Sequence, residues 1–156
     1  VIDEVIKVEL PVDAHLPHEY VPEERLRLEA YRRLANARTE AEVLGVVEEL
    51  ADRYGSLPTP VETLVSIASL RVVLQAVGIT EVIATAASVK FSPVELVESR
   101  ILRLNRLYPG SVIKPATRTI VVPRNKDSLI GAVAKSADID LVEWVNTWVA
   151  SIVAAP

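Results

Sequence analysis

The pattern of apolar and polar residues along the first 60 positions predicts a short strand followed by two helices. Val5 to Leu10 alternates apolar and polar side chains, which is typical of a half-buried strand. From Glu23 to Arg38 apolar residues recur at helical spacing, which predicts an amphipathic helix. Thr39 and Glu42 form a capping box that starts a second helix, and Gly55 stops it.

A third helix is predicted to be buried. Thr59 combines a cap with Pro60 at the first helical position, and Gly78 ends the helix. The apolar residues of this segment cover most of its circumference rather than one stripe. We therefore place the helix of residues 60–77 at the centre of the domain.

Strand patterns dominate the next part of the chain. Ile79 to Phe91 is rich in β-branched residues and predicts two strands or one bent strand. Ser92 to Glu95 repeats the cap chemistry of residues 59–62 and predicts a fourth helix to about Leu107. The repeat is either an internal duplication or, as we favour, a start signal that two helices use independently. Residues 111–114 and 118–122 predict a hairpin.

The last part of the chain predicts two further helices. Asp127 or Ser128 can cap a short one, and Asp138 or Asp140 a longer one. Together the elements indicate a mixed α/β fold with about five short strands and five or six helices. The 156 residues are about the size of one domain, and the 50% hydrophobic content is enough for a sizeable core. We therefore expect residues 1–156 to form a single compact domain.

The sequence carries no recognisable targeting or membrane segment. Its first residues are not a basic region followed by an apolar run, so we predict no signal peptide. The most apolar tract, Leu64 to Ile79, is interrupted by Arg71 and Gln75 and is shorter than the roughly 20 residues of a bilayer span. We expect a soluble domain. Because the chain begins with Val1 rather than methionine, we also expect it to be a piece of a longer protein.

Few residues offer chemistry of their own. The absence of cysteine excludes disulfides, thiolate zinc sites and cysteine nucleophiles. The two histidines, His15 and His18, are separated by Pro17, so we interpret them as loop residues rather than metal ligands. No phosphate-binding loop, dinucleotide motif or nucleophile elbow occurs, and carboxylate pairs lie on polar helix faces. We expect no catalytic residue, no cofactor and no metal in this chain.

Charge is distributed unevenly. The formal net charge of -4 argues against a protein that coats nucleic acid. Residues 1–60 hold 13 acidic and 7 basic side chains, whereas residues 71–126 hold 9 basic and 3 acidic ones. Such asymmetry can orient a protein against a charged partner, although ordinary helix surfaces produce similar counts by chance.

An acidic cluster lies where a helix disfavours it. Glu48, Glu49 and Asp52 fall near the end of the second helix, where the dipole costs about 0.3 to 1 kcal/mol for each negative charge. Only Arg53 offsets them. Glu49 and Asp52 are three residues apart and share one face, which we expect to point away from the apolar side near Leu50. The cluster indicates a docking patch for a basic surface; the alternative is a solvated face that the fold tolerates.

Several ordered motifs in residues 16–71 resemble a known family. Leu16-Pro17 precedes Y-V-P-E, and the other motifs are R-L-x-x-Y-R-R-L-A from Arg27, T-E-x-E-V from Thr39 and D-R-Y-G-x-L-P-x-P from Asp52. In this order they closely resemble the C-terminal domain of the bacterial transcription-repair coupling factors (Mfd). The resemblance covers about half of the chain well.

The resemblance implies a role in DNA repair. In that family the full-length protein is an ATP-driven DNA translocase of the bacterial cytoplasm, which displaces stalled RNA polymerase and recruits nucleotide-excision repair. The motor motifs lie in other domains. The C-terminal domain is implied to be regulatory: it packs on the N-terminal module of the same protein and covers the surface that the damage-recognition ATPase would use.

The resemblance also implies the docking residues. Matching the helix ahead of D-R-Y-G places the partner-facing acids at Glu49 and Asp52, and Glu48 and Arg53 are either further contacts or solvated. The competing hypothesis is a module that contacts nucleic acid or polymerase through the basic region 71–126. The low aromatic content, 4%, disfavours a base-stacking platform. A self-contained enzyme is the third hypothesis, and no set of converging polar residues supports it.

Overall fold

The structure is a computed structural model that describes residues 6–124 and 137–154. The helices are α1 (Glu24–Asn36), α2 (Glu40–Tyr54), α3 (Thr59–Val77), α4 (Glu98–Leu107) and α5 (Ala137–Trp148), which continues as the π-helix η3 (Val149–Ala154). The strands are β1 (Lys7–Glu9), β2 (Glu81–Ala84), β3 (Ser88–Ser92), β4 (Val112–Lys114) and β5 (Thr119–Pro123), and the short 3-10 helix η1 (Pro115–Thr117) joins β4 to β5. The predicted mixed α/β class is confirmed.

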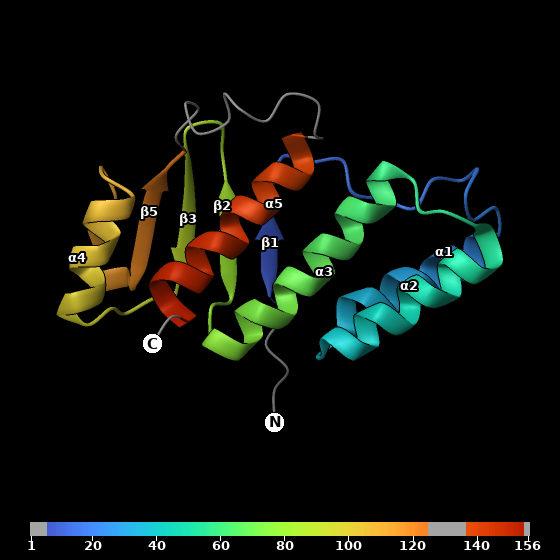
Figure 1. Cartoon of the computed structure of the whole chain (residues 1–156), viewed down its shortest axis with the longest axis horizontal. Coiled ribbons are helices and arrows are strands. Elements are labelled where there is room, and N and C mark those ends of the chain that lie inside the picture. The colour runs from blue at the N-terminus through green and yellow to red at the C-terminus, as the bar shows by residue number, and fades with distance from the viewer. Residues whose placement is uncertain (1–5, 125–136, 155–156) are drawn as a thin grey trace.

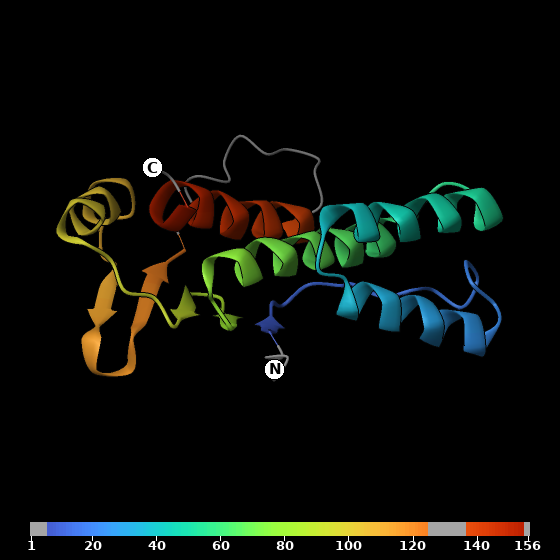
Figure 2. The same cartoon turned by 90° about the horizontal axis from the view of Figure 1, so that it is seen from below.

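The five strands form one mixed sheet in the order β1-β2-β3-β5-β4. Only β1 runs parallel to its neighbour, β2; the other pairs are antiparallel. Seen edge-on, α3, α4 and α5 lie on one side of this sheet (Figure 2). Strand residues that point to the helices are buried, among them Val82, Phe91 and Ile120, as the period of two in a strand requires.

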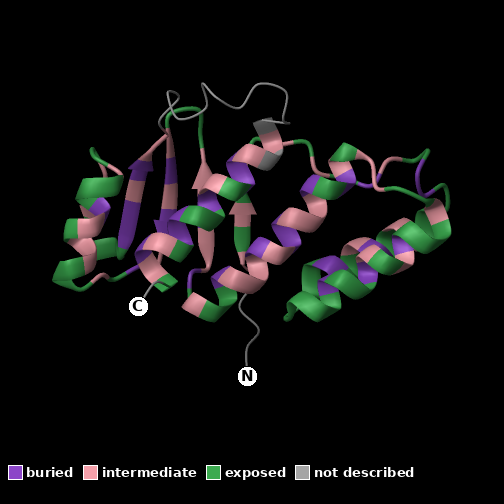
Figure 3. Ribbon diagram, in the orientation of Figure 1, coloured by how far each residue is buried: buried purple, intermediate pink, exposed green. Residues whose placement is uncertain are grey.

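Two hydrophobic clusters meet along α3. The larger one fills the space between the sheet, α3 and α5, and contains Phe91 stacked on Trp148 with ring centroids 3.8 Å apart. The smaller one joins α1, α2 and α3 with the loop that precedes α1. Because α3 contributes Ile67 to the first cluster and Ala68 to the second, it needs apolar residues all round. Figure 3 shows buried segments along its length, which agrees with the predicted central position.

The helical hairpin of α1 and α2 lies beside the sheet rather than on it (Figure 1). Its second helix begins as predicted, since Thr39 Oγ1 accepts a hydrogen bond from Glu42 N–H at 3.2 Å. Gly55 ends α2 with a φ of 86°, a left-handed value that favours glycine. The predicted cap of α3 is wrong: Pro58 is the cap residue, and Thr59 lies inside the helix, where its carbonyl accepts from Thr63 Oγ1.

The predicted start of the fourth helix is also wrong. Ser92 belongs to β3, where it pairs with Glu81, and its carbonyl accepts the Thr80 N–H at 3.0 Å. Val94 N–H donates to the Arg118 carbonyl at 2.7 Å. These contacts hold the segment extended until α4 begins at residue 98. Contacts distant in sequence have therefore overridden a good local cap signal.

The other strand predictions are resolved. Residues 79–91 form two strands rather than one bent strand, and the hairpin predicted over 111–122 is confirmed as β4, η1 and β5. Asp138 and Asp140 lie in the first turn of α5. The short helix predicted after Asp127 or Ser128 lies outside the described residues.

Length and composition alone would allow α3 to cross a membrane, and it is the one such helix in the described part of the chain. A core helix of a soluble protein passes the same test, so the indication is weak. In this fold α3 packs on α5 at one side and on α1 and α2 at the other.

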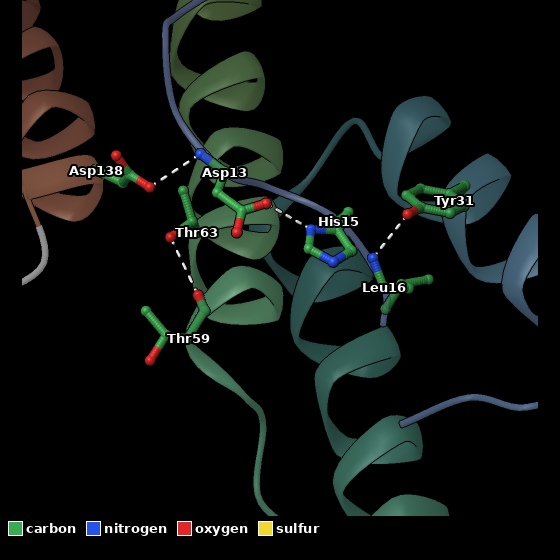
Figure 4. A network of polar contacts seen from close by, with 7 residues as sticks. All are labelled: Asp13, His15, Leu16, Tyr31, Thr59, Thr63 and Asp138. Carbon is green, nitrogen blue, oxygen red and sulfur yellow. Dashed lines mark hydrogen bonds and ion pairs between the residues drawn. The ribbon is translucent and has the colours of Figure 1, made fainter. Parts of the chain in front are cut away.

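A polar network fastens the loop between β1 and α1 to three helices (Figure 4). The Asp138 carboxylate of α5 accepts the Asp13 N–H at 2.9 Å, and the Asp13 carboxylate contacts His15 Nδ1 at 2.6 Å. The Leu16 N–H donates to the Tyr31 hydroxyl of α1 at 2.7 Å. The backbone N–H of His15 donates to the Pro60 carbonyl in the first turn of α3. This loop therefore positions α1 relative to the sheet layer.

Candidate docking surface

The end of α2 is held by a buried tyrosine. The Tyr20 hydroxyl lies 2.8 Å from the Gly55 carbonyl and 3.2 Å from the Leu50 carbonyl, two acceptors at the C-terminal end of α2. Its ring packs against Tyr54 with centroids 5.6 Å apart. Burial raises the pKa of the Tyr20 hydroxyl, and the neighbouring Tyr54 adds to the shift. The contacts of Tyr20 thus fix the position of the last turns of α2 and of the side chains that they carry.

Two of the predicted docking residues are free. Glu48 and Asp52 are exposed, and neither forms a hydrogen bond or an ion pair in the parts of the chain that the structure describes. Their positions on α2 are opposite the side that buries Val46 and Leu50. Two negative charges near the C-terminal end of a helix are unfavourable, and among the residues of the last turn of α2 only Arg53 carries a compensating positive charge.

Glu49 behaves differently from its neighbours. Arg33 of α1 forms an ion pair with its Oε2 atom, and Arg53 lies 3.8 Å from its Oε1 atom. The hydrogen bond from Arg33 and the charge of Arg33 hold the pKa of the Glu49 carboxyl below its usual range, and Arg53 contributes to this shift. Glu49 still exposes 40% of its side chain.

The predicted orientation of Glu49 is corrected by this arrangement. It does not point away from the apolar side of α2 but lines a groove between α1 and α2 that has a volume of about 370 Å³. The charged residues of this groove are three arginines and two glutamates: Arg25, Arg33, Arg53, Glu29 and Glu49. The acidic cluster thus divides into an exposed pair, Glu48 and Asp52, and a third carboxylate embedded among arginines.

Arg33 is the residue that sequence reasoning missed. It lies four residues after Glu29, a spacing that is typical of an ion pair on the surface of one helix. Its partner Glu49 is 16 residues away and becomes a neighbour only when the hairpin closes. No local pattern could have identified this pair.

Five of the eight described bases in the region 71–126 have partners inside the domain. The side chain of Arg100 donates to the carbonyls of Ile152 and Val153 at 2.9 Å, and that of Arg103 donates to the Ser151 carbonyl at 3.2 Å. Both arginines thus cap the C-terminal end of η3. Other bases of the region also have internal partners: Lys90 with Glu81, Arg118 with Glu95, and Arg124 with the Thr85 carbonyl.

The histidines show no metal-site geometry. His15 pairs with Asp13, and His18 is an exposed loop residue. Among residues 6–124 and 137–154, no three histidine, aspartate or glutamate side chains gather in a way that could hold a metal ion.

Sequence comparison identifies a family and several relatives. A family model described as the TRCF domain matches residues 10–101. The chain is 43% identical over 152 residues to the transcription-repair-coupling factors of Mycobacterium bovis and Mycobacterium tuberculosis, an alignment that covers 97% of this chain. It is 44% identical over 73 residues to the protein of that name from Escherichia coli, covering 47% of this chain.

The length covered in these relatives is small. The chain spans 12% of the two mycobacterial proteins and 6% of the one from Escherichia coli.

Among solved structures, the crystal structure of the C-terminal domain of a transcription-repair coupling factor matches with a TM-score of 0.68 at 18% identity. The match covers 86% of this chain and 84% of that one, so the two share a fold over most of their length.

Proposed function

The chain belongs to the transcription-repair coupling factor family, and from this premise we propose that it is a non-catalytic regulatory domain that docks on the N-terminal module of its parent protein. In the docked state it masks the surface of that module that the damage-recognition ATPase uses. The parent is an ATP-dependent DNA translocase that displaces stalled RNA polymerase and recruits nucleotide-excision repair. Engagement of polymerase and DNA favours the undocked arrangement and exposes the masked surface.

One observation supports this docking proposal most directly. Glu48 and Asp52 are exposed charges at the end of a helix that Tyr20 anchors, and no cation of the described residues pairs with either one. A rigid acidic helix end is suited to a basic surface, because its charges need little reordering on contact. Glu49 and Arg53 lie beside them at the edge of the groove and complete the proposed contact.

The energies required are modest. An exposed charge pair contributes only about 0.2 to 1 kcal/mol, so several pairs must act together. A closed state favoured by about 3 kcal/mol nevertheless keeps the open form below about 1% of the molecules. A small charged interface can therefore regulate access while remaining easy to open.

The test is a double charge reversal in the full-length parent. Glu49→Arg with Asp52→Arg should raise the apparent affinity for the damage-recognition ATPase at least about tenfold, because closure no longer competes. Glu19→Arg with Glu143→Arg is the matched control, since both residues are exposed and the change in net charge is equal. Equal affinities of the two double variants would exclude the proposed docking patch.

The alternative, a module that contacts nucleic acid or polymerase through residues 71–126, has less support. Arg100 and Arg103 of α4 donate to backbone carbonyls of η3. A guanidinium group that already donates to carbonyls at a helix end has fewer N–H groups left to bind a phosphate.

A further inference from the structure

Two arginines of the same domain already share the Glu49 carboxylate. Arg33, in the last turn of α1, donates to Oε2, and Arg53, one turn along α2, lies near Oε1. Both oxygens therefore face a guanidinium in the undocked domain. About two fifths of the Glu49 side chain is exposed, so a group from outside can still reach it.

A cation that arrives at Glu49 also meets Arg33. A carboxylate has lone pairs for about four hydrogen bonds, so a further donor can be accommodated. Two positive groups at one carboxylate nevertheless repel each other. The incoming cation and Arg33 must therefore compete for the same oxygen atoms.

We propose that Arg33 is an internal competitor for docking. The proposal rests on the function proposed above and refines it. When the domain docks, Glu49 exchanges its partner from Arg33 to a guanidinium or ammonium group on the N-terminal module. Glu48 and Asp52, which have no internal partner among the described residues, make the first contact. Arg33 thereby weakens the closed state and keeps it releasable.

The test compares two arginines of one helix in the full-length parent. Arg33→Gln removes the competitor, so docking tightens and the apparent affinity for the damage-recognition ATPase falls about three- to tenfold. Arg25→Gln removes the same charge from the same groove, but Arg25 forms no hydrogen bond or ion pair with the described residues. We expect the control to change the affinity less than about twofold.

Each outcome separates this inference from the function on which it rests. If Glu49→Arg with Asp52→Arg opens the protein but Arg33→Gln acts no more strongly than Arg25→Gln, the competitor is refuted and the docking patch stands. The competitor is likewise refuted if Arg33→Gln weakens docking, because Arg33 would then hold Glu49 in place for the partner. If none of the substitutions changes the affinity, both proposals fail.

A second measurement examines the contact itself. NMR titration of this chain should show a Glu49 pKa below its ordinary value, and Arg33→Gln should return it toward that value. Arg25→Gln should leave the Glu49 pKa unchanged. If Arg33→Gln leaves the Glu49 pKa unchanged, no such pair exists in solution and the inference is overturned.

Discussion

The arginine cap at the end of η3 leads to the prediction that best separates the two binding hypotheses. Replacing Arg100 and Arg103 together by glutamine removes three hydrogen bonds from charged donors to the carbonyls of residues 151, 152 and 153. A hydrogen bond to a charged group is worth about 1.5 to 3 kcal/mol, and cations at a helix C-terminus add about 0.3 to 1 kcal/mol.

The expected loss is smaller than the sum of these values. Both arginines are partly exposed, so water replaces some of the lost contacts in the variant. We therefore expect the double substitution to lower the free energy of unfolding by about 2 to 3 kcal/mol. The midpoint of urea unfolding should therefore fall to a lower urea concentration, while the slope of the unfolding free energy against urea concentration stays unchanged. Trp148, which is buried in the larger cluster and directly precedes η3, provides a fluorescence signal for the transition.

Two further measurements complete this experiment. Arg106→Gln is the control, because Arg106 is exposed in the last turn of the same helix, and it should shift stability by less than about 0.5 kcal/mol. Titration with duplex DNA at several salt concentrations should show weak binding that the double substitution changes little. Unchanged stability together with a large loss of DNA affinity would refute the structural interpretation and favour the nucleic-acid hypothesis.

Three other predictions follow from individual contacts. Tyr20→Phe keeps the ring but leaves the Gly55 carbonyl without its donor, so it should lower the free energy of unfolding by about 1 kcal/mol in urea; no change would contradict the anchoring role. Arg71 has no hydrogen bond or ion pair in the described chain, and burial lowers the pKa of its guanidinium. Arg71→Met should therefore raise the thermal midpoint, by an amount equivalent to about 1 kcal/mol, and a fall would show that the charge is needed. The lowered pKa of Glu49 stabilises the fold above its unfolded pKa of about 4.3, and this contribution disappears as pH falls through the folded value. Screening keeps this contribution below about 0.5 kcal/mol, and Arg33→Gln should remove most of it, so that the variant loses less stability as pH falls below about 4.3.

Local signals were sufficient where contacts close in sequence decide the structure. Thr39 and Glu42 start α2, and Gly55 and Gly78 end the two helices that they follow, because each acts on a backbone group a few residues away. The apolar circumference of α3 likewise indicated a central helix, and its two packing partners explain why one stripe was not enough. Each of these features can be predicted from residues that are close together in the sequence.

Prediction failed where a distant segment competes with a local preference. Ser92 has the chemistry of a cap, yet its place in the ladder opposite Glu81 keeps it in a strand. The same limit applies to the docking surface. An exposed Asp52 followed from its position on α2, whereas the pairing of Glu49 depends on the angle and register between two helices. Side-chain partners across a hairpin are determined by packing, which no single segment contains.

The fold places part of the acidic and part of the basic segment of the sequence at opposite ends of the molecule. The acidic first part of the chain includes the hairpin of α1 and α2 at one end of the molecule, whereas α4, with its arginines, lies at the opposite end (Figure 1). At that end Arg100, Arg103 and Arg118 are engaged by carbonyls and carboxylates of the domain, whereas Arg106 and Lys114 are exposed and have no partner among the described residues. The acids at the hairpin are only partly compensated, because Arg33 and Arg53 reach Glu49 and leave Glu48 and Asp52 in water. At the hairpin the two free carboxylates lie on one face of α2, next to the helix end that Tyr20 holds, so this end can offer a fixed pair of charges to a basic partner.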